Sequence, residues 1–123
     1  MMDESTRDRA AAIFAALGNP GRLAVVQLVV DEEMTVNEIA HTLKIGQSTA
    51  SMHLSCLTRA GVLTVTQRGT HRYYRARGPR IGRILKLVRK YCDIHGLEGK
   101  PERGPMRAAS SLAWLTALAE MAD

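Results

Sequence analysis

Residues 35–61 read TVNEIAHTLKIGQSTASMHLSCLTRAG, and this stretch decides the fold. Thr35 and Glu38 have the spacing of a capping box, after which apolar residues recur at helical spacing up to Leu43. The sequence Lys44-Ile45-Gly46 then predicts a tight turn in which Gly46 is free to take a positive φ. A second helical pattern follows. Two short helices joined by such a turn predict a helix-turn-helix unit.

The charge around this unit is strongly segregated. Residues 39–92 contain eleven Lys or Arg residues and no Asp or Glu, whereas all 12 acidic residues of the chain lie before or after this block. The net charge of the 123-residue chain is +5. A segregated basic surface is typical of nucleic-acid-binding proteins, although a solvated basic face without a partner remains an alternative.

The second helix of the unit has two chemically distinct sides. Gln47 or Ser48 is expected to cap it. At about 100° per residue, Ala50, Leu54 and Leu57 share the inner side. Short hydroxyl side chains on the outer side would let the helix approach the floor of the major groove. The predicted DNA contacts of this helix are Gln47, Ser48, Thr49, Ser51, Met52, Ser55 and Arg59.

A basic β-hairpin is predicted directly after the helix-turn-helix unit. Residues 62–66 and 71–76 are rich in Val, Thr and Tyr, and residues 67–70 separate them with turn chemistry. Arginines at a hairpin tip can bind phosphates or the minor groove. The predicted DNA contacts of the hairpin are Arg68, His71, Arg72 and Arg75.

Helical patterns flank these elements on both sides. Ser5 and Asp8 predict a capping box for a first helix, and Asn19-Pro20 predicts the start of a second. The second helix is rich in valine and could be a strand, but the Asn-Pro start and its length favour a helix. Residues 81–92 predict a helix after the hairpin, and residues 106–121 predict a helical tail. We expect a DNA-binding domain over residues 1–95 and a linker with a C-terminal helix over residues 96–123.

The order of three short motifs resembles a known family. The motifs GQSTASMHL (46–54), AGVL (60–63) and RYYR (72–75) resemble the ArsR/SmtB winged-helix repressors, and the resemblance runs from about residue 14 to residue 92. It implies a mainly α fold with a β-hairpin wing. It also implies a homodimer, joined through the first helix and the helix after the wing, that binds a palindromic operator and dissociates when a ligand or an oxidant acts.

The metal sites of this family are not matched by this sequence. The Cys-x-Cys site is missing because residues 35–38 contain no cysteine, and the dimer-helix site is missing because Asp93 and His95 have no second pair. Cys56 resembles a thiolate ligand of the lead and cadmium sensors, but Ala60 stands where the second thiolate is expected. We therefore predict no metal site and no cofactor.

Three alternatives stay open for the signal that the protein senses. A soft metal could bind through Cys56, although such a site has fewer ligands than a soft metal ion requires. A thiol oxidant could act on Cys56 and Cys92, since the basic setting of Cys56 favours a thiolate. Thiol-sensing relatives resemble this chain at Cys92 but have their partner cysteine in the second helix, where this chain has none. The third alternative is a different inducer or none.

Other function classes are disfavoured. No Ser-His-acid or paired-carboxylate arrangement indicates an enzyme. Two cysteines suit a reducing cytosol, the start of the chain does not resemble a signal peptide, and no apolar run approaches the ~20 residues of a membrane span. We expect a cytoplasmic, homodimeric, sequence-specific repressor that binds double-stranded DNA. A winged-helix module for protein–protein or RNA binding is the alternative.

Overall fold

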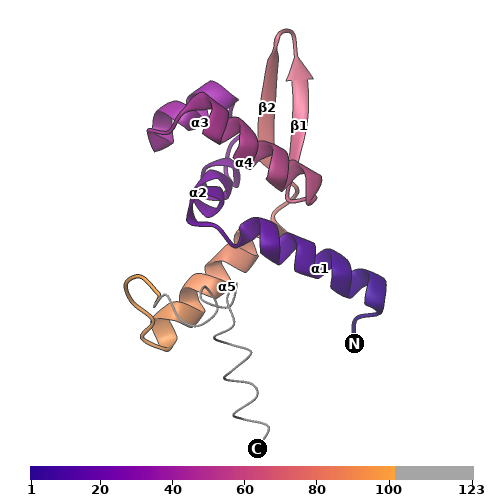
Figure 1. Cartoon of the computed structure of the whole chain (residues 1–123), viewed down its shortest axis with the longest axis vertical. Coiled ribbons are helices and arrows are strands. Elements are labelled where there is room, and N and C mark those ends of the chain that lie inside the picture. Colours follow the sequence, from indigo (N-terminus) through magenta and orange to yellow (C-terminus); the bar gives the residue numbers. More distant parts are fainter. Residues whose placement is uncertain (102–123) are drawn as a thin grey trace, which may run out of the picture. The chain divides into compact units, whose positions relative to one another are not determined.

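The computed structural model describes residues 1–101, and within that range it contains five helices and one β-hairpin (Figure 1). The elements are α1 (Glu4–Leu17), α2 (Pro20–Val29), α3 (Val36–Leu43), α4 (Gln47–Arg59), β1 (Leu63–Arg68), β2 (His71–Ala76) and α5 (Arg80–Ile94). Met1–Val88 forms one compact unit, and a second unit begins at Arg89. The helix predicted over residues 106–121 lies outside the described residues, and the domain boundary at residue 95 stays a prediction.

The first two helices begin at side-chain caps. Asp3, and not the predicted Ser5, caps α1, because its carboxylate accepts a hydrogen bond of 2.8 Å from the Thr6 backbone N–H. Asn19 caps α2 as predicted by accepting from the Arg22 N–H at 3.0 Å, with Pro20 at the first helical position. The valine-rich segment is therefore a helix, because burial of its valines outweighs their weak β preference.

The helix-turn-helix unit forms as predicted, but its turn differs in detail. The Thr35 and Glu38 capping box is complete, with hydrogen bonds of 3.0 and 3.2 Å. Lys44, and not Gly46, takes the left-handed conformation, with φ 56°. Gly46 instead caps α4 with an extended backbone, so the predicted caps at Gln47 or Ser48 are wrong.

A Schellman motif explains why the lysine occupies the left-handed position. The Ile45 N–H donates to the Ala40 carbonyl at 3.0 Å, and the Lys44 N–H donates to the His41 carbonyl at 3.3 Å. This pattern requires a positive φ at the residue directly after the helix, whichever residue stands there. It also turns Ile45 back against the core, which compensates the strain of about 1–2 kcal/mol at a non-glycine residue.

The hydrophobic core lies among α2, α3, α4 and the base of the hairpin. Its largest fully buried side chains are Ile39, Leu54, Leu57, Leu63, Val25, Val26, Val29 and Val62. No polar or charged residue is buried in residues 1–101. An aliphatic core of this kind, with almost no aromatic residues, fixes the tilt of α4 against α2 through close side-chain packing.

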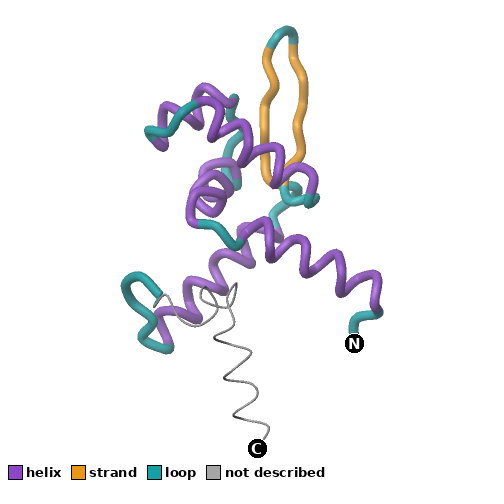
Figure 2. Tube along the Cα trace, viewed as in Figure 1, coloured by secondary structure: helices purple, strands orange, loops and turns teal. Residues whose placement is uncertain are grey.

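The first strand of the hairpin starts one residue later and ends two residues later than the sequence predicted, and the second strand is as predicted. β1 extends through Arg68, so the connection to β2 is the two-residue turn Gly69-Thr70 with φ +63° at Gly69. Two hydrogen bonds between Met34 and Tyr74, of 3.0 and 2.8 Å, add an isolated bridge beside β2. Figure 2 shows the two strands as an extension beyond the helices that support them.

The helix α5 starts against the core. Ile81 is buried, and a Cβ added to Gly82 would come within 2.9 Å of Val30 Cγ1, so only a glycine allows this close approach to the end of α2.

Among the described residues no single helix is long and apolar enough to cross a membrane. The two helices α1 and α2 reach that length and composition only together, and they are bent by 96°.

Candidate nucleic-acid interface

The outer side of α4 is a solvent-exposed surface of small polar side chains and one methionine. All seven residues predicted to contact DNA from this helix are exposed, including Thr49 and Arg59. Five of them line an open, shallow hollow: Gln47, Ser48, Ser51, Met52 and Ser55. Met52 is 70% exposed, which leaves its side chain available for contact with a thymine methyl group.

The opposite side of α4 holds the helix in place. Ala50, Leu54 and Leu57 are completely buried. Because these three positions alternate at helical spacing with the exposed set, the packing of the inner side determines which side chains face solvent. The sequence prediction for the two sides of α4 is confirmed in this respect, and DNA contact by the outer side stays a proposal.

His53 lies between these two sides and contacts α2. Its Nε2 lies so close to Gly21 that a Cβ added there would be only 2.8 Å away. Burial, and secondarily the positive charge of Arg22, lower the pKa of His53 below its ordinary value of 6.5. Arg22 is itself fixed, because its Nε donates to the Ala16 carbonyl at 2.5 Å at the end of α1. His53 is therefore a packing residue between α4 and α2.

The lowered pKa of His53 predicts a loss of stability in weak acid. Since the unfolded chain takes up a proton near pH 6.5 and the folded chain only at lower pH, the free energy of unfolding should fall as pH drops below 6.5. Above that pH this group contributes no pH dependence. Urea unfolding from about pH 8 to about pH 5 should show a smaller acid-side loss in His53→Gln than in the wild type. Parallel curves for the two proteins would contradict the prediction.

The hairpin distributes its positive charges over both faces. Directly paired residues share a face, and the pairs are Leu63 with Ala76, Gln67 with Arg72, Thr64 with Arg75, and Arg68 with His71. Leu63 and Ala76 are buried in the core. Arg72 is four residues from Ala76 along β2, so it lies on the same face of the hairpin, farther toward the tip. Arg68, His71 and Arg75 lie on the other face. All four predicted contact residues are exposed.

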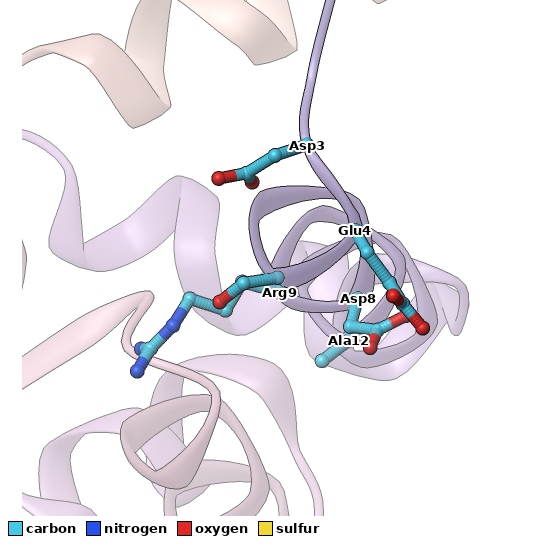
Figure 3. A pocket seen from close by; sticks show the side chains of 6 residues that line it. Asp3, Glu4, Asp8, Arg9 and Ala12 are labelled. Atoms are coloured by element: carbon cyan, nitrogen blue, oxygen red, sulfur yellow. The ribbon is translucent and has the colours of Figure 1, made fainter.

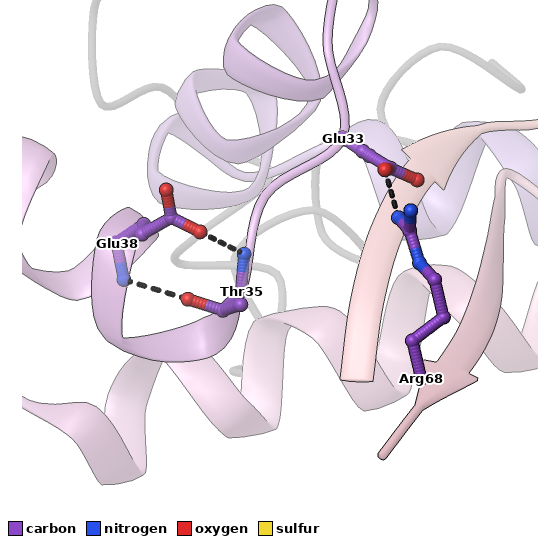
Figure 4. Close-up of polar contacts among 4 residues, drawn as sticks. All are labelled: Glu33, Thr35, Glu38 and Arg68. Atoms are coloured by element: carbon purple, nitrogen blue, oxygen red, sulfur yellow. Dashed lines mark hydrogen bonds and ion pairs between the residues drawn. The ribbon is translucent and has the colours of Figure 1, made fainter. Parts of the chain in front are cut away.

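One of these arginines has partners that the sequence did not reveal. Arg68 Nη2 forms an ion pair with Glu33 Oε1, which lies in the turn between α2 and α3 (Figure 4). The Arg68 guanidinium also lies 4.2 Å from the centre of the Tyr73 ring, within the range of a cation–π interaction. No periodic pattern in the sequence links the acidic run at residues 31–33 to the hairpin.

Neither of the two thiols belongs to a metal-binding cluster among residues 1–101. Cys56 and Cys92 are both free and half-buried, and Cys56 packs against the core. No group of three or more His, Cys, Asp or Glu side chains that could hold a metal ion occurs among the described residues. A hollow at the start of α1 is lined by three acidic side chains, those of Asp3, Glu4 and Asp8, and by one basic side chain, that of Arg9 (Figure 3). Its charge is unsuitable for DNA.

Comparison with known proteins places this geometry in a family. The family model for the arsR family of bacterial regulatory proteins matches residues 19–65. An HTH-type transcriptional regulator of Methanocaldococcus jannaschii is 38% identical over 82 residues, which cover 66% of this chain and 92% of that protein. The transcriptional repressor PagR of Bacillus anthracis is 34% identical over 79 residues, which cover 63% of this chain and 79% of PagR.

A solved structure agrees with these sequence matches. The homodimeric winged helix-turn-helix DNA-binding domain of a possible ArsR-family regulator from Mycobacterium bovis superimposes with a TM-score of 0.70 and 30% identity. The match covers 85% of this chain and 97% of that domain. The element order α1 to α5 with its hairpin is thus the winged helix-turn-helix fold. The chain belongs to the ArsR family of transcriptional regulators and carries that family's DNA-binding winged helix-turn-helix domain.

Proposed function

We propose that the protein is a homodimeric repressor that binds a palindromic operator. In this proposal the outer side of α4 enters the major groove, and the hairpin contacts the adjacent phosphates as the wing. The observation that carries the proposal is the exposed face of α4, where Ser51, Met52 and their neighbours present short or flexible side chains to solvent. The repressor assignment is supported by the similarity to PagR.

The homodimer is supported by the exposed apolar side chains. Five of the ten large hydrophobic side chains that are exposed in residues 1–101 lie on α5 or directly after it. These are Leu87, Val88, Tyr91, Ile94 and Leu97. A monomeric protein rarely exposes such a stripe along one helix, and the similar domain from Mycobacterium bovis is homodimeric. A two-fold dimer would present two copies of α4 to two half-sites, which explains a palindromic operator.

A gel shift with the DNA upstream of the protein's own gene tests the proposal. We expect a dimer to bind this DNA at least about 10³-fold more tightly than random DNA of the same length. A reporter fused to the same DNA should give less transcript when the protein is present. Equal affinity for both DNAs, or preferential binding of RNA, would instead favour a module for RNA or protein binding.

The same gel shift tests release by an effector, which is part of the proposal. It is repeated with a soft metal ion and with a thiol oxidant. If either agent abolishes the shifted band, the experiment is repeated with Cys56→Ser and with Cys92→Ser. The variant that lacks the responsive thiol should keep its shifted band. The proposal contains no catalytic step, in keeping with relatives that are transcriptional regulators.

A further inference from the structure

The turn before α3 carries an acidic side chain in a fixed position beside the wing. Met34 is joined to Tyr74 of β2 by two backbone hydrogen bonds, of 3.0 and 2.8 Å. Thr35 directly afterwards caps α3. Glu33 is therefore held at the edge of the hairpin. The next residue, Met34, is bridged to β2, and α3 begins directly after Thr35. The backbone of Glu33 has little freedom to move away.

The side chain of Arg68 follows the face of the hairpin toward this carboxylate. Arg68 pairs with His71, so Arg68, His71 and Tyr73 share one face of the two strands. The guanidinium lies over the Tyr73 ring at 4.2 Å and forms the ion pair with Glu33 beyond it. The side chain of Arg68, at the end of β1, thus points back along the hairpin toward Glu33 (Figure 4).

We propose that Glu33 is an internal counterion of the wing that occupies Arg68 until a DNA phosphate displaces it. This inference rests on the proposed binding of DNA by the wing. A carboxylate and a phosphate offer the same oxygen acceptors to a guanidinium, so one can replace the other without a change in the kind of bond. Tyr73 keeps the guanidinium on the outer face during the exchange.

The exposure of the pair indicates that it can exchange. The Arg68 and Glu33 side chains are 53% and 38% exposed, respectively, so water and salt reach both of them. Ion pairs of this kind contribute little to stability and are readily broken. DNA concentrates negative charge at the place where the wing binds, and this favours the exchange. Glu33 thus weakens binding to any DNA, because Arg68 must first leave it.

Glu33→Gln should therefore strengthen DNA binding through Arg68. We expect its affinity for the operator to rise about two- to five-fold over the wild type, as measured by fluorescence anisotropy. The slope of log K against log[salt] should stay close to that of the wild type, because Arg68 contacts the phosphate in both complexes and only its release from Glu33 differs. Glu32→Gln is the matched control, because it removes the same charge from the same turn without touching the ion pair.

Arg68→Ala and the double variant Glu33→Gln/Arg68→Ala complete the experiment. If the inference is right, Glu33→Gln gives no gain in affinity in the Arg68→Ala background. An equal gain with and without Arg68, or an equal gain in Glu32→Gln, would show a general effect of charge and overturn it. Weaker binding by a folded Glu33→Gln protein would overturn it as well, because Glu33 would then support the DNA-bound wing. Wild-type binding in the same titrations tests the proposed function separately.

Discussion

Ser51→Glu should abolish operator binding, with a loss of affinity of about 100-fold or more. Ser51 lies within the outer face of α4, where Gln47, Ser48 and Ser55, three or four positions away on the helix, are also exposed and polar. A glutamate here would bring a negative charge against phosphates and against the acceptor atoms of the base edges. Like charges brought together at an interface cost several kcal/mol.

The same substitution should leave the fold intact. Ser51 is exposed, and glutamate is a better helix former than serine, so the free energy of unfolding should change by no more than about 0.5 kcal/mol. Gln27→Glu is the matched control, since it adds the same charge at an exposed position of α2. Anisotropy titrations with operator DNA and thermal unfolding are the measurements. Comparable losses of affinity in Ser51→Glu and Gln27→Glu would mean that α4 has no special role.

Local patterns in the sequence predicted most of the fold because its elements are determined locally. The capping box of Thr35 and Glu38, the Asn19-Pro20 start and the burial of Leu54 and Leu57 all depend on residues within one or two turns of each other. The errors in the turn between α3 and α4 arose because the geometry of the helix end, and not the residue type, determines the backbone conformation there. The Schellman motif places the left-handed residue at Lys44, whereas composition alone favours Gly46.

The sequence predicted the exposed residues of the candidate site but not the ion pair within it. The exposed residues of α4 follow from helical periodicity, and those of the hairpin follow from alternation along the strands. The ion pair between Glu33 and Arg68 joins residues 35 positions apart, and it depends on the bridge that brings the turn before α3 beside β2. No periodic pattern encodes such a contact, and the end of β1 had been predicted two residues too early.

Leu87→Asp should convert the proposed dimer into a monomer and thereby remove most of its affinity for the operator. Leu87 and Val88 are 66% and 53% exposed, so the aspartate meets solvent in a single copy and should not unfold the Met1–Val88 unit. At a two-fold interface the substitution occurs twice, and each carboxylate must lose its water against apolar side chains. We expect a molecular mass near that of one chain at micromolar concentration, measured by light scattering after gel filtration.

The loss of DNA binding should follow from the loss of the second half-site. A monomer presents one α4, so the binding free energies of two half-sites no longer combine, and we expect affinity to fall by about 100-fold or more. Lys86→Gln is the matched control, because it also lowers the net charge by one but replaces a polar side chain of α5. If Leu87→Asp stays dimeric, the exposed apolar stripe of α5 is not the dimer contact. If Lys86→Gln loses as much affinity as Leu87→Asp, the loss reflects the basic charge of α5 and not the second half-site, since both substitutions lower the net charge by one.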